Sequence, residues 1–348
     1  MRPTKKSKTK NVVVIGGGTG TFTVLSALKD YHLHLTAIVS MADDGGSTGA
    51  LRDQYGVLPP GDIRRALVAL SASDTLRDLF NYRFLKGDLA GHNFGNIFLS
   101  ALEQVKGNFA LAVDEASRVL NIKGKVLPVT LDNVRLCARL ADGKIINGET
   151  NIDIPRSKIR ARISEIWLNP AARVNPEAKK AVLTADLIVI GPGDLYTSLI
   201  PNLLVKGLPE AIKKSRAKKV FVCNLMTKYG ETNGFKAEDF AQKIEKYLGR
   251  GVLDFAIFNN KKPHPKILAR YRKEGAEFIE PPKPPPTPSF VRRGAKENSL
   301  PPYEGGREGL GVKYLPKYIL ADLLDNGPFI RHNPRQKLAR ALTRLLDS

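Results

Sequence analysis

The chain has few cysteines and no long hydrophobic run. Two cysteines, Cys137 and Cys223, occur in 348 residues, and both lie in apolar stretches. Neither has the spacing of a metal site or a disulfide framework, which favours a reducing cytoplasm. No apolar stretch reaches the roughly eighteen residues that a membrane-spanning helix needs. The basic N-terminus leads into a short apolar run and a glycine loop, which is not a signal-peptide pattern. We therefore expect a cytoplasmic protein without a membrane span.

Negative charge is also scarce, since 34 acidic residues stand against 55 lysines and arginines and give a net charge of +21. Such an excess raises the question of nucleic-acid binding. The basic residues are spread over 1–10, 156–162, 213–219 and the C-terminal segment, without the interleaved aromatics of an RNA-binding surface. We expect 1–10 to be a disordered basic tail and the other basic segments to be solvated faces rather than a nucleic-acid interface.

Residues 12–20 join a buried-strand pattern to a glycine loop. The β-branched run from Val12 to Ile15 is typical of a strand covered on both faces of a parallel sheet. The loop that follows is Gly16, Gly17, Gly18, Thr19 and Gly20. Such a loop turns backbone N–H groups toward an anion, at the start of a helix expected at Thr21–Leu28. The third glycine of a dinucleotide fingerprint and the lysine of a Walker loop are absent. The loop predicts a site for a phosphorylated ligand but does not say which ligand. The alternative is a tight turn that binds no ligand.

The pattern of strand, glycine loop and helix is repeated along the chain. A second strand at 35–39 is also followed by a glycine loop, which is typical of a doubly wound parallel sheet. Ligands of such sheets bind beyond the carboxyl ends of the strands, so we expect the loops to share one crevice. Further strands are expected at 185–190, 219–225 and 252–258, a strand or short helix at 318–324, and helices at 62–71, 75–84, 96–105, 110–120, 177–184 and 334–346. The predicted fold class is α/β, Rossmann-like and doubly wound.

Two insertions are expected within a single α/β domain of residues 11–348. Residues 126–154 have the pattern of antiparallel strands with a hairpin turn at Asp142-Gly143, and predict a small β insertion. Residues 281–314 are rich in proline, glycine and charge, and a proline run cannot build a sheet ladder. We expect a disordered surface loop there, with a polyproline ligand for a partner module as the alternative.

Asp43 and Asp44 are the candidates for binding a cation. They precede a second loop that contains Gly45, Gly46, Ser47 and Thr48. Mg²⁺ prefers one or two carboxylates together with phosphate oxygens and water. The structural alternative is that one aspartate caps the next helix. No Ser-His-Asp or Cys-His arrangement is evident, so no catalytic residue is assigned.

Further polar residues lie at the starts of helices and at the ends of later strands. Asp62 is expected to cap its helix, and one of Arg64 and Arg65 is expected to face an anion from the first turn, with Arg64 taken as the site candidate. His92 is a candidate proton donor or phosphate ligand, with a loop histidine of no chemical role as the alternative. The remaining candidates for ligand binding are Asn93, Asn96, Gly191, Gly193, Asp194, Tyr196, Thr197, Ser198, Asn224 and Thr227.

Taken in order, these motifs resemble the gluconeogenesis factor (YvcK) branch of the CofD-like family. The segments that carry the resemblance are 16–20, 42–49, 59–64, 91–96, 191–198 and 224–227. The resemblance implies a Rossmann-like fold and a nucleotide-diphosphate site. One departure is Lys228-Tyr229, where the family pattern leads us to expect Gln-Pro or a similar pair.

The resemblance implies a cytoplasmic binder of UDP-sugars, notably UDP-N-acetylglucosamine, that is required for cell shape and cell-wall synthesis during gluconeogenic growth. The alternative is a phosphotransferase of the 2-phospho-L-lactate transferase type, which uses a nucleotide-diphosphate donor and Mg²⁺. For a UDP-sugar, we expect Tyr271 to stack on the uracil ring and Arg331 to clamp the diphosphate. Core packing of Tyr271 and helix capping by Arg331 are the structural alternatives. A protein partner in envelope synthesis is implied, and a homodimer is left open.

Overall fold

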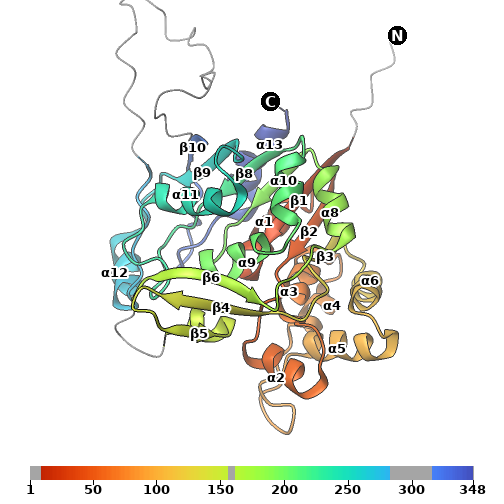
Figure 1. Ribbon diagram of the computed structural model, residues 1–348. Helices are drawn as coiled ribbons and strands as arrows, with labels where there is room; N and C mark the ends of the chain where they lie inside the picture. Colours follow the sequence, from red (N-terminus) through yellow and green to blue (C-terminus); the bar gives the residue numbers. More distant parts are fainter. Residues whose placement is uncertain (1–8, 156–160, 283–315, 348) are drawn as a thin grey trace, which may run out of the picture.

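A parallel sheet forms the centre of the molecule (Figure 1). The structure is a computed structural model that describes residues 9–155, 161–282 and 316–347. The strands of the main sheet are β1 (Lys10–Gly16), β2 (Leu33–Val39), β3 (Lys125–Pro128), β7 (Leu187–Ile190), β8 (Lys218–Val222), β9 (Phe255–Asn259) and β10 (Lys317–Ala321). Their order is β10-β9-β8-β7-β1-β2-β3, and every neighbouring pair is parallel.

The order of the strands reverses between β1 and β7. From β1 the chain moves outward to β2 and β3, whereas from β7 it moves outward in the opposite direction to β8, β9 and β10. Loops that leave two such strands diverge and open a crevice at the carboxyl ends of the strands. The loop after β1 is the glycine loop at 16–20, and the loop after β7 contains residues 191–198. The doubly wound α/β class predicted from the sequence is confirmed.

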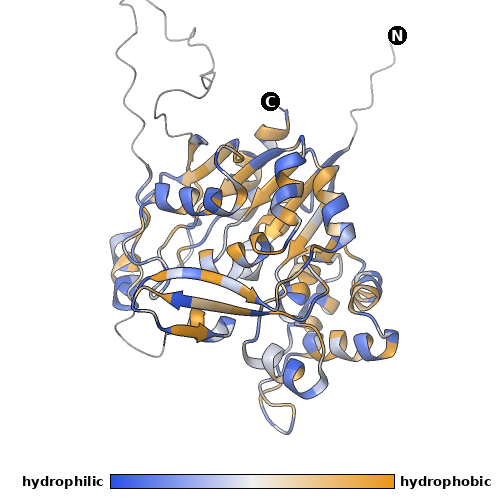
Figure 2. Cartoon of the chain, viewed as in Figure 1, coloured by the Kyte–Doolittle hydropathy of each residue, from blue (hydrophilic) through white to orange (hydrophobic). Residues whose placement is uncertain are grey.

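The central strands are buried because they are continuous apolar runs. Residues 12–15 of β1 and 187–190 of β7 are each at most 1% exposed. β-branched side chains fit the pleated surface of a sheet that is covered on both faces. Figure 2 shows hydrophobic residues concentrated in the sheet and on the helix faces that pack on it, with hydrophilic residues outside.

Helices cover both faces of the sheet, as right-handed crossovers in two opposite directions require. Helix α1 (Gly18–Leu28) packs against α3, η2 and α13 on one side, and α10 packs against α8, α9 and α11 on the other. These elements are α3 (Gly61–Leu70), η2 (Pro334–Leu338), α13 (Ala339–Asp347), α8 (Pro176–Leu183), α9 (Ile200–Leu203), α10 (Leu208–Lys214) and α11 (Ala237–Leu248). The others are α2 (Gly46–Tyr55), α4 (Asp74–Asn81), α5 (Phe94–Lys106), α6 (Phe109–Val119), α7 (Glu149–Asp153), the π-helical turn η1 (Leu195–Leu199) and α12 (Pro265–Lys273). Within the described ranges, every helix is too short or too polar to cross a membrane.

A small antiparallel sheet is inserted between β3 and α8, and Figure 1 shows it in yellow-green. Its strands are β4 (Arg135–Leu140), β5 (Ile145–Asn147) and β6 (Ile163–Asn169), in the order β5-β4-β6. The hairpin at Asp142-Gly143 is confirmed, since β4 and β5 pair antiparallel across it. The predicted bounds of 126–154 are wrong at both ends. Strand β3 is an uninterrupted buried run that pairs parallel with β2 in the main sheet, and β6 was not predicted.

Other boundaries also differ from those expected. Residues 1–8 of the predicted basic tail, and residues 283–315 of the predicted proline-rich insertion, lie outside the described residues. Lys10 is the first residue of β1, and the Thr9 hydroxyl lies 2.9 Å from Nε2 of His32. The predicted tail therefore extends too far. The segment that was expected as a strand or a short helix forms strand β10.

The two loops at the reversal point touch at Gly20. A Cβ atom on Gly20 would lie 1.9 Å from the carbonyl oxygen of Pro192. The second loop is held in place because the Gly193 N–H donates to the Asn224 side-chain oxygen at 3.0 Å. Gly20 is required for this close approach of two backbones.

The contact predicts that Gly20→Ala is destabilising although alanine favours helices. The methyl group would force the two loops apart, and we expect a loss of about 3 kcal/mol in the free energy of unfolding. Urea denaturation followed by circular dichroism measures this loss. Gly327→Ala is the control, because its methyl group would meet the flexible ends of Asp325 and Arg331. Equal stability of the two variants would contradict the prediction.

Candidate functional site

A cavity of about 1300 Å³ lies at the carboxyl ends of β1 and β7. Its walls come from the loops after β1, β2, β7, β8 and β10, together with α3, α12 and α7 of the insertion. The predicted site residues that line it are Gly17, Gly18, Thr19, Gly20, Asp43, Gly45, Gly46, Asp62, Gly193, Asp194, Thr197, Ser198, Asn224, Tyr271 and Arg331. The structure therefore brings together the two glycine loops and the two residues near the C-terminal end that were expected to hold a nucleotide.

Other predicted site residues lie outside the lining of this cavity. They are Gly16, Asp44, Ser47, Thr48, Arg64, His92, Asn93, Asn96, Gly191, Tyr196 and Thr227. Tyr196 is buried, with the ammonium of Lys243 5.5 Å from its ring centre. The Thr227 hydroxyl accepts a hydrogen bond from the Glu277 N–H at 2.8 Å. These contacts give the two side chains a structural role in supporting the loops.

Arg64 belongs to a buried network beside the cavity. Its guanidinium donates to the side-chain oxygens of Asn96 at 3.0 Å and Asn81 at 2.7 Å. Burial lowers the pKa of Arg64 to about 10, with the nearby charge of Arg65 acting in the same direction. Of the two arginines, Arg65 lines the cavity and Arg64 does not, so the choice of Arg64 as the site candidate is corrected.

His92 and Asn93 fix the start of α2 against α5. The His92 Nδ1 lies 3.3 Å from the Ser47 hydroxyl oxygen, which also accepts the Asn93 N–H at 3.2 Å. The Asn93 side chain caps α5 by accepting the Asn96 N–H. Asn96 in turn donates to the Thr48 hydroxyl at 3.5 Å. These residues contact the second glycine loop through Ser47 and Thr48 and lie outside the cavity lining.

The two neighbouring aspartates have different surroundings. The Asp44 carboxylate accepts the backbone N–H groups of Glu149 at 3.1 Å and Thr150 at 2.9 Å, and lies 3.6 Å from Arg135. It thus ties the insertion helix α7 to the second glycine loop. Asp43 accepts the Gly45 N–H at 3.0 Å and lines the cavity. Of this pair, Asp43 is the one placed to meet a ligand or a cation.

Asp62 binds the first glycine loop. The prediction that it is an N-cap is wrong, since Pro60 is at that position and Asp62 lies in the first turn of α3. Its carboxylate accepts the Gly18 N–H at 3.0 Å and pairs with Arg65 at 3.1 Å. Burial, with the charge of Asp43 as the next cause, raises its pKa to about 6. Thr19 and Gly20 follow Gly18 in the first turn of α1. The N–H groups of a first turn have no acceptor within the helix, so those of Thr19 and Gly20 can donate to a ligand.

The insertion adds acidic groups that sequence reasoning missed. Glu149 lines the cavity, and burial together with the charges of Asp43 and Asp153 raises its pKa to about 9. It is therefore protonated at neutral pH. The Thr150 hydroxyl has no hydrogen-bond partner among the described residues. No motif marks Glu149 or Asp153 in the sequence, because a five-residue helix from an insertion places them.

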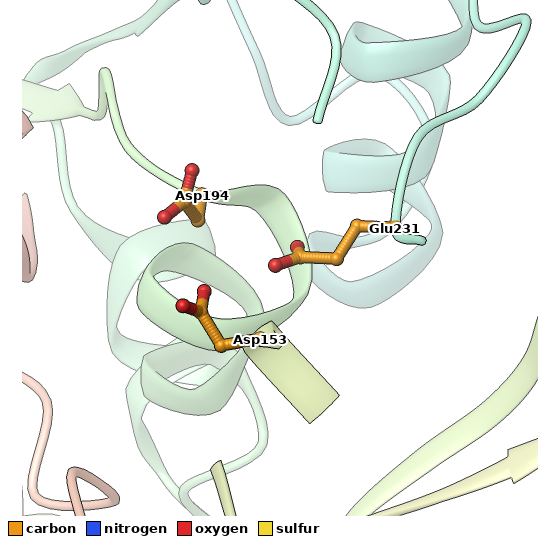
Figure 3. Close-up of side chains that lie close together, drawn as sticks. All are labelled: Asp153, Asp194 and Glu231. Atoms are coloured by element: carbon orange, nitrogen blue, oxygen red, sulfur yellow. The ribbon is translucent and has the colours of Figure 1, made fainter. Parts of the chain in front are cut away.

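Three carboxylates from different segments converge beside the cavity (Figure 3). Asp153, Asp194 and Glu231 point toward one another, with oxygens within 4.8 Å. The Lys228 ammonium lies among them, 2.8 Å from Asp194, 3.6 Å from Glu231 and hydrogen-bonded to Asp153. Lys228 was noted in the sequence only as part of the Lys228-Tyr229 pair, and no prediction placed it among these carboxylates.

Glu231 is the buried member of this cluster. Its carboxylate accepts the Tyr196 N–H and the Thr197 hydroxyl, each at 3.2 Å. Burial, followed by the charge of Asp194, raises its pKa to about 8, although Lys228 acts in the opposite direction. Burial by itself would lower the pKa of the Lys228 ammonium. The neighbouring carboxylates together have the larger effect, so the net result is a raised pKa. Lys228 thus stays charged and joins the insertion to the loops after β7 and β8.

Aromatic and basic side chains form the opposite end of the cavity. The Tyr271 hydroxyl oxygen accepts the Ile330 N–H at 3.2 Å, which joins α12 to the loop after β10. The Arg270 guanidinium lies 5.5 Å from the Tyr271 ring centre and 5.0 Å from that of Phe329. Arg331 pairs with Asp325 at 2.8 Å and its side chain is 65% exposed. Phe329 was not predicted, although an exposed aromatic in a cavity is a signal for stacking.

The fold and the cavity define a doubly wound α/β protein with glycine loops at the switch point. A family model described as 2-phospho-L-lactate transferase CofD matches residues 12–284. The chain belongs to the CofD family, in the branch of proteins named gluconeogenesis factors.

The relatives are similar over most of the chain. A gluconeogenesis factor of Bacillus subtilis is 42% identical over 273 residues, which cover 77% of this chain and 84% of the relative. A relative from Aquifex aeolicus is 41% identical over 347 residues, 98% of each chain. A crystal structure of a UPF0052 family member from Bacillus halodurans is 38% identical and superposes with a TM-score of 0.82, covering 97% of this chain and 99% of that one.

The carboxylate cluster predicts a large effect of Lys228→Met on stability. Removal of the ammonium leaves the half-buried Asp153 and Asp194, together with the buried Glu231, without their counter-ion. We expect a loss of about 3 kcal/mol in the free energy of unfolding. Lys262→Met is the matched control, because its pair with Glu280 is exposed and contributes less than about 1 kcal/mol. Urea denaturation at pH 7 measures both losses. A Lys228→Met protein as stable as the control would show that the cluster does not need the lysine.

Proposed function

We propose that the cavity binds a UDP-sugar, UDP-N-acetylglucosamine foremost. The observation that carries this proposal is the convergence of a glycine loop, an aromatic wall and Arg331 in one cavity at the switch point. Ligand pockets for small molecules have volumes of roughly 300–1,000 Å³. A cavity of about 1300 Å³ is large enough for a nucleotide joined to a sugar.

The parts of the ligand are assigned by chemistry. The diphosphate would lie at the positive end of α1, near the N–H groups of Thr19 and Gly20. Arg65 and Arg331 are the cations of the cavity lining that would balance its charge. The uracil ring would stack at the end formed by Tyr271 and Phe329, because every base has a face suited to an aromatic side chain.

The biological role that we propose is regulatory. Relatives of this chain are named gluconeogenesis factors, and this name supports the proposal of a role in growth on gluconeogenic carbon. A cytoplasmic protein that binds a cell-wall precursor would report the level of that precursor to envelope synthesis, and would affect cell shape. This role requires a protein partner in envelope synthesis, and a homodimer is compatible with it.

The proposal predicts that UDP-N-acetylglucosamine binds saturably and that Arg331→Ala weakens binding at least about tenfold. Loss of a charge-assisted contact to a phosphate is worth roughly 1.5–3 kcal/mol. Isothermal titration calorimetry measures both dissociation constants. Arg344→Ala is the control, since Arg344 is exposed on α13 and outside the cavity lining. Absence of binding of both UDP-N-acetylglucosamine and UDP-glucose to the wild-type protein would overturn the proposal.

A second candidate function, phosphotransfer from a nucleotide-diphosphate donor, is favoured by the acidic lining and by the description of the matching family model. The Asp43 carboxylate and the unpartnered Thr150 hydroxyl are oxygen donors of the kind that Mg²⁺ takes. When bound, Mg²⁺ would neutralise charge on the diphosphate. Phosphotransfer depends mainly on positioning and charge neutralisation, so a nucleophilic side chain is not required.

The transferase candidate predicts that, with Mg²⁺ present, the distal phosphoryl group of a UDP- or GDP-linked donor passes to the oxygen of an added alcohol or of water, and the nucleoside monophosphate leaves. Asp43→Asn should lower the rate at least about a hundredfold, because it removes charge from the proposed cation site. Asp53→Asn, at an exposed ion pair with Arg135, is the control. Chromatography of the nucleotides measures the release. If no donor yields a monophosphate with or without Mg²⁺, the transferase candidate fails and the binding function is unaffected.

A further inference from the structure

His332 lines the cavity and has no part in the assignments above. The residue lies in the loop after β10 and is 7% exposed. Its Nε2 is 3.1 Å from the carbonyl oxygen of Cys223, just beyond the end of β8. A carbonyl oxygen can only accept a hydrogen bond, so the imidazole carries a proton on Nε2. The backbone thus fixes the tautomer of this ring.

The other ring nitrogen, Nδ1, is consequently an acceptor. Burial lowers the pKa of His332 to about 4, with the Cys223 carbonyl acting in the opposite direction. The ring is neutral at pH 7, and Nδ1 keeps its lone pair. Among the described residues, the hydrogen bond recorded for the His332 ring is the one made by Nε2. His332, a residue of the cavity lining, therefore carries a hydrogen-bond acceptor with a fixed protonation state.

Asn224 supplies a donor to the same cavity lining. Asn224 follows Cys223 directly, so the carbonyl that holds His332 belongs to the peptide bond between Cys223 and Asn224. Its Oδ1 accepts the Gly193 N–H at 3.0 Å, which assigns the amide orientation and leaves Nδ2 as a donor. Asn224 also lines the cavity. The acceptor and the donor thus belong to two residues of the lining that are connected through the backbone at Cys223.

We infer that His332, together with Asn224, determines which nucleobase the cavity accepts. The pair is complementary to a ring N–H next to a carbonyl, as at N3 and O4 of uracil. Cytosine has the same size but offers a lone pair at N3 and an amino group at C4. In the same position, the N3 lone pair of cytosine would face the Nδ1 lone pair, and its amino group would face the Asn224 amide N–H. Neither pair could form a hydrogen bond. The inference rests on the proposed nucleotide-binding function and adds its base specificity.

Calorimetric titration of the full chain with UDP and with CDP tests the inference. A site whose buried groups are left unpaired by an analogue of equal shape discriminates strongly. We therefore expect UDP to bind the wild-type protein at least about tenfold more tightly than CDP. His332→Phe keeps a planar ring but removes both nitrogens, and should bring the two affinities within about threefold of each other. A purely structural effect would weaken both ligands by the same factor and leave their ratio unchanged.

Two further variants sharpen the test. Asn224→Asp keeps an acceptor for the Gly193 N–H but turns the donor toward the base into an acceptor, so the ratio should move toward CDP. This variant decides the matter alone if His332→Phe does not fold. Phe329→Leu is the matched control on the same wall. It should weaken UDP and CDP by a similar factor, because stacking is largely insensitive to the identity of the base.

The outcomes separate this inference from the function on which it rests. Equal binding of UDP and CDP to the wild-type protein would overturn base selection and leave nucleotide binding in place. The same would follow if His332→Phe or a folded Asn224→Asp retained the wild-type ratio. If neither UDP nor a UDP-sugar binds the wild-type protein, the proposed function fails, and base selection fails with it.

Discussion

The contact between two loops at the reversal of strand order determines the rest of the site. Opposite winding from β1 and β7 separates their connections and leaves a crevice. Gly20 then lets the first loop approach the backbone at Pro192, so the crevice is closed at its base. Asn224, in the loop after β8, holds the second loop through Gly193. His332, in the loop after β10, contacts the carbonyl oxygen of the preceding residue, Cys223. The cavity therefore depends on backbone contacts that tolerate little change in volume.

Around this base, the cavity has two ends of different chemistry. The insertion contributes acidic groups, among them Asp153 and Glu149, whereas the segment after β10 contributes Phe329 and Arg331. Asp44 and Lys228 attach the insertion to the main sheet by hydrogen bonds and ion pairs. A ligand with a charged middle and unlike ends suits such a cavity better than one with uniform chemistry.

The parallel sheet and the glycine loops were predictable because their signals are local. A β-branched run followed by glycines marks β1 and its loop, and the same pattern marks β2 and β7. The placement of Arg64 was not predictable, since adjacent arginines in a helix point in different directions and only packing decides which is buried. Asp62 was misassigned because its position before a helix resembles a cap, whereas its partner, Gly18, is distant in sequence. Glu149 and Asp153 reach the cavity from an insertion, which no local pattern can place.

Lys228 has a consequence for the physical chemistry of the cavity. Its ammonium is a counter-ion attached to the chain, so its local concentration does not depend on the salt or divalent cations of the solution. A free ion at this position would exchange with solvent, and the acidic end of the cavity would loosen whenever the ion was scarce. With the lysine in place, the arrangement of Asp153, Asp194 and Glu231 is encoded in the sequence and persists through changes in ionic composition.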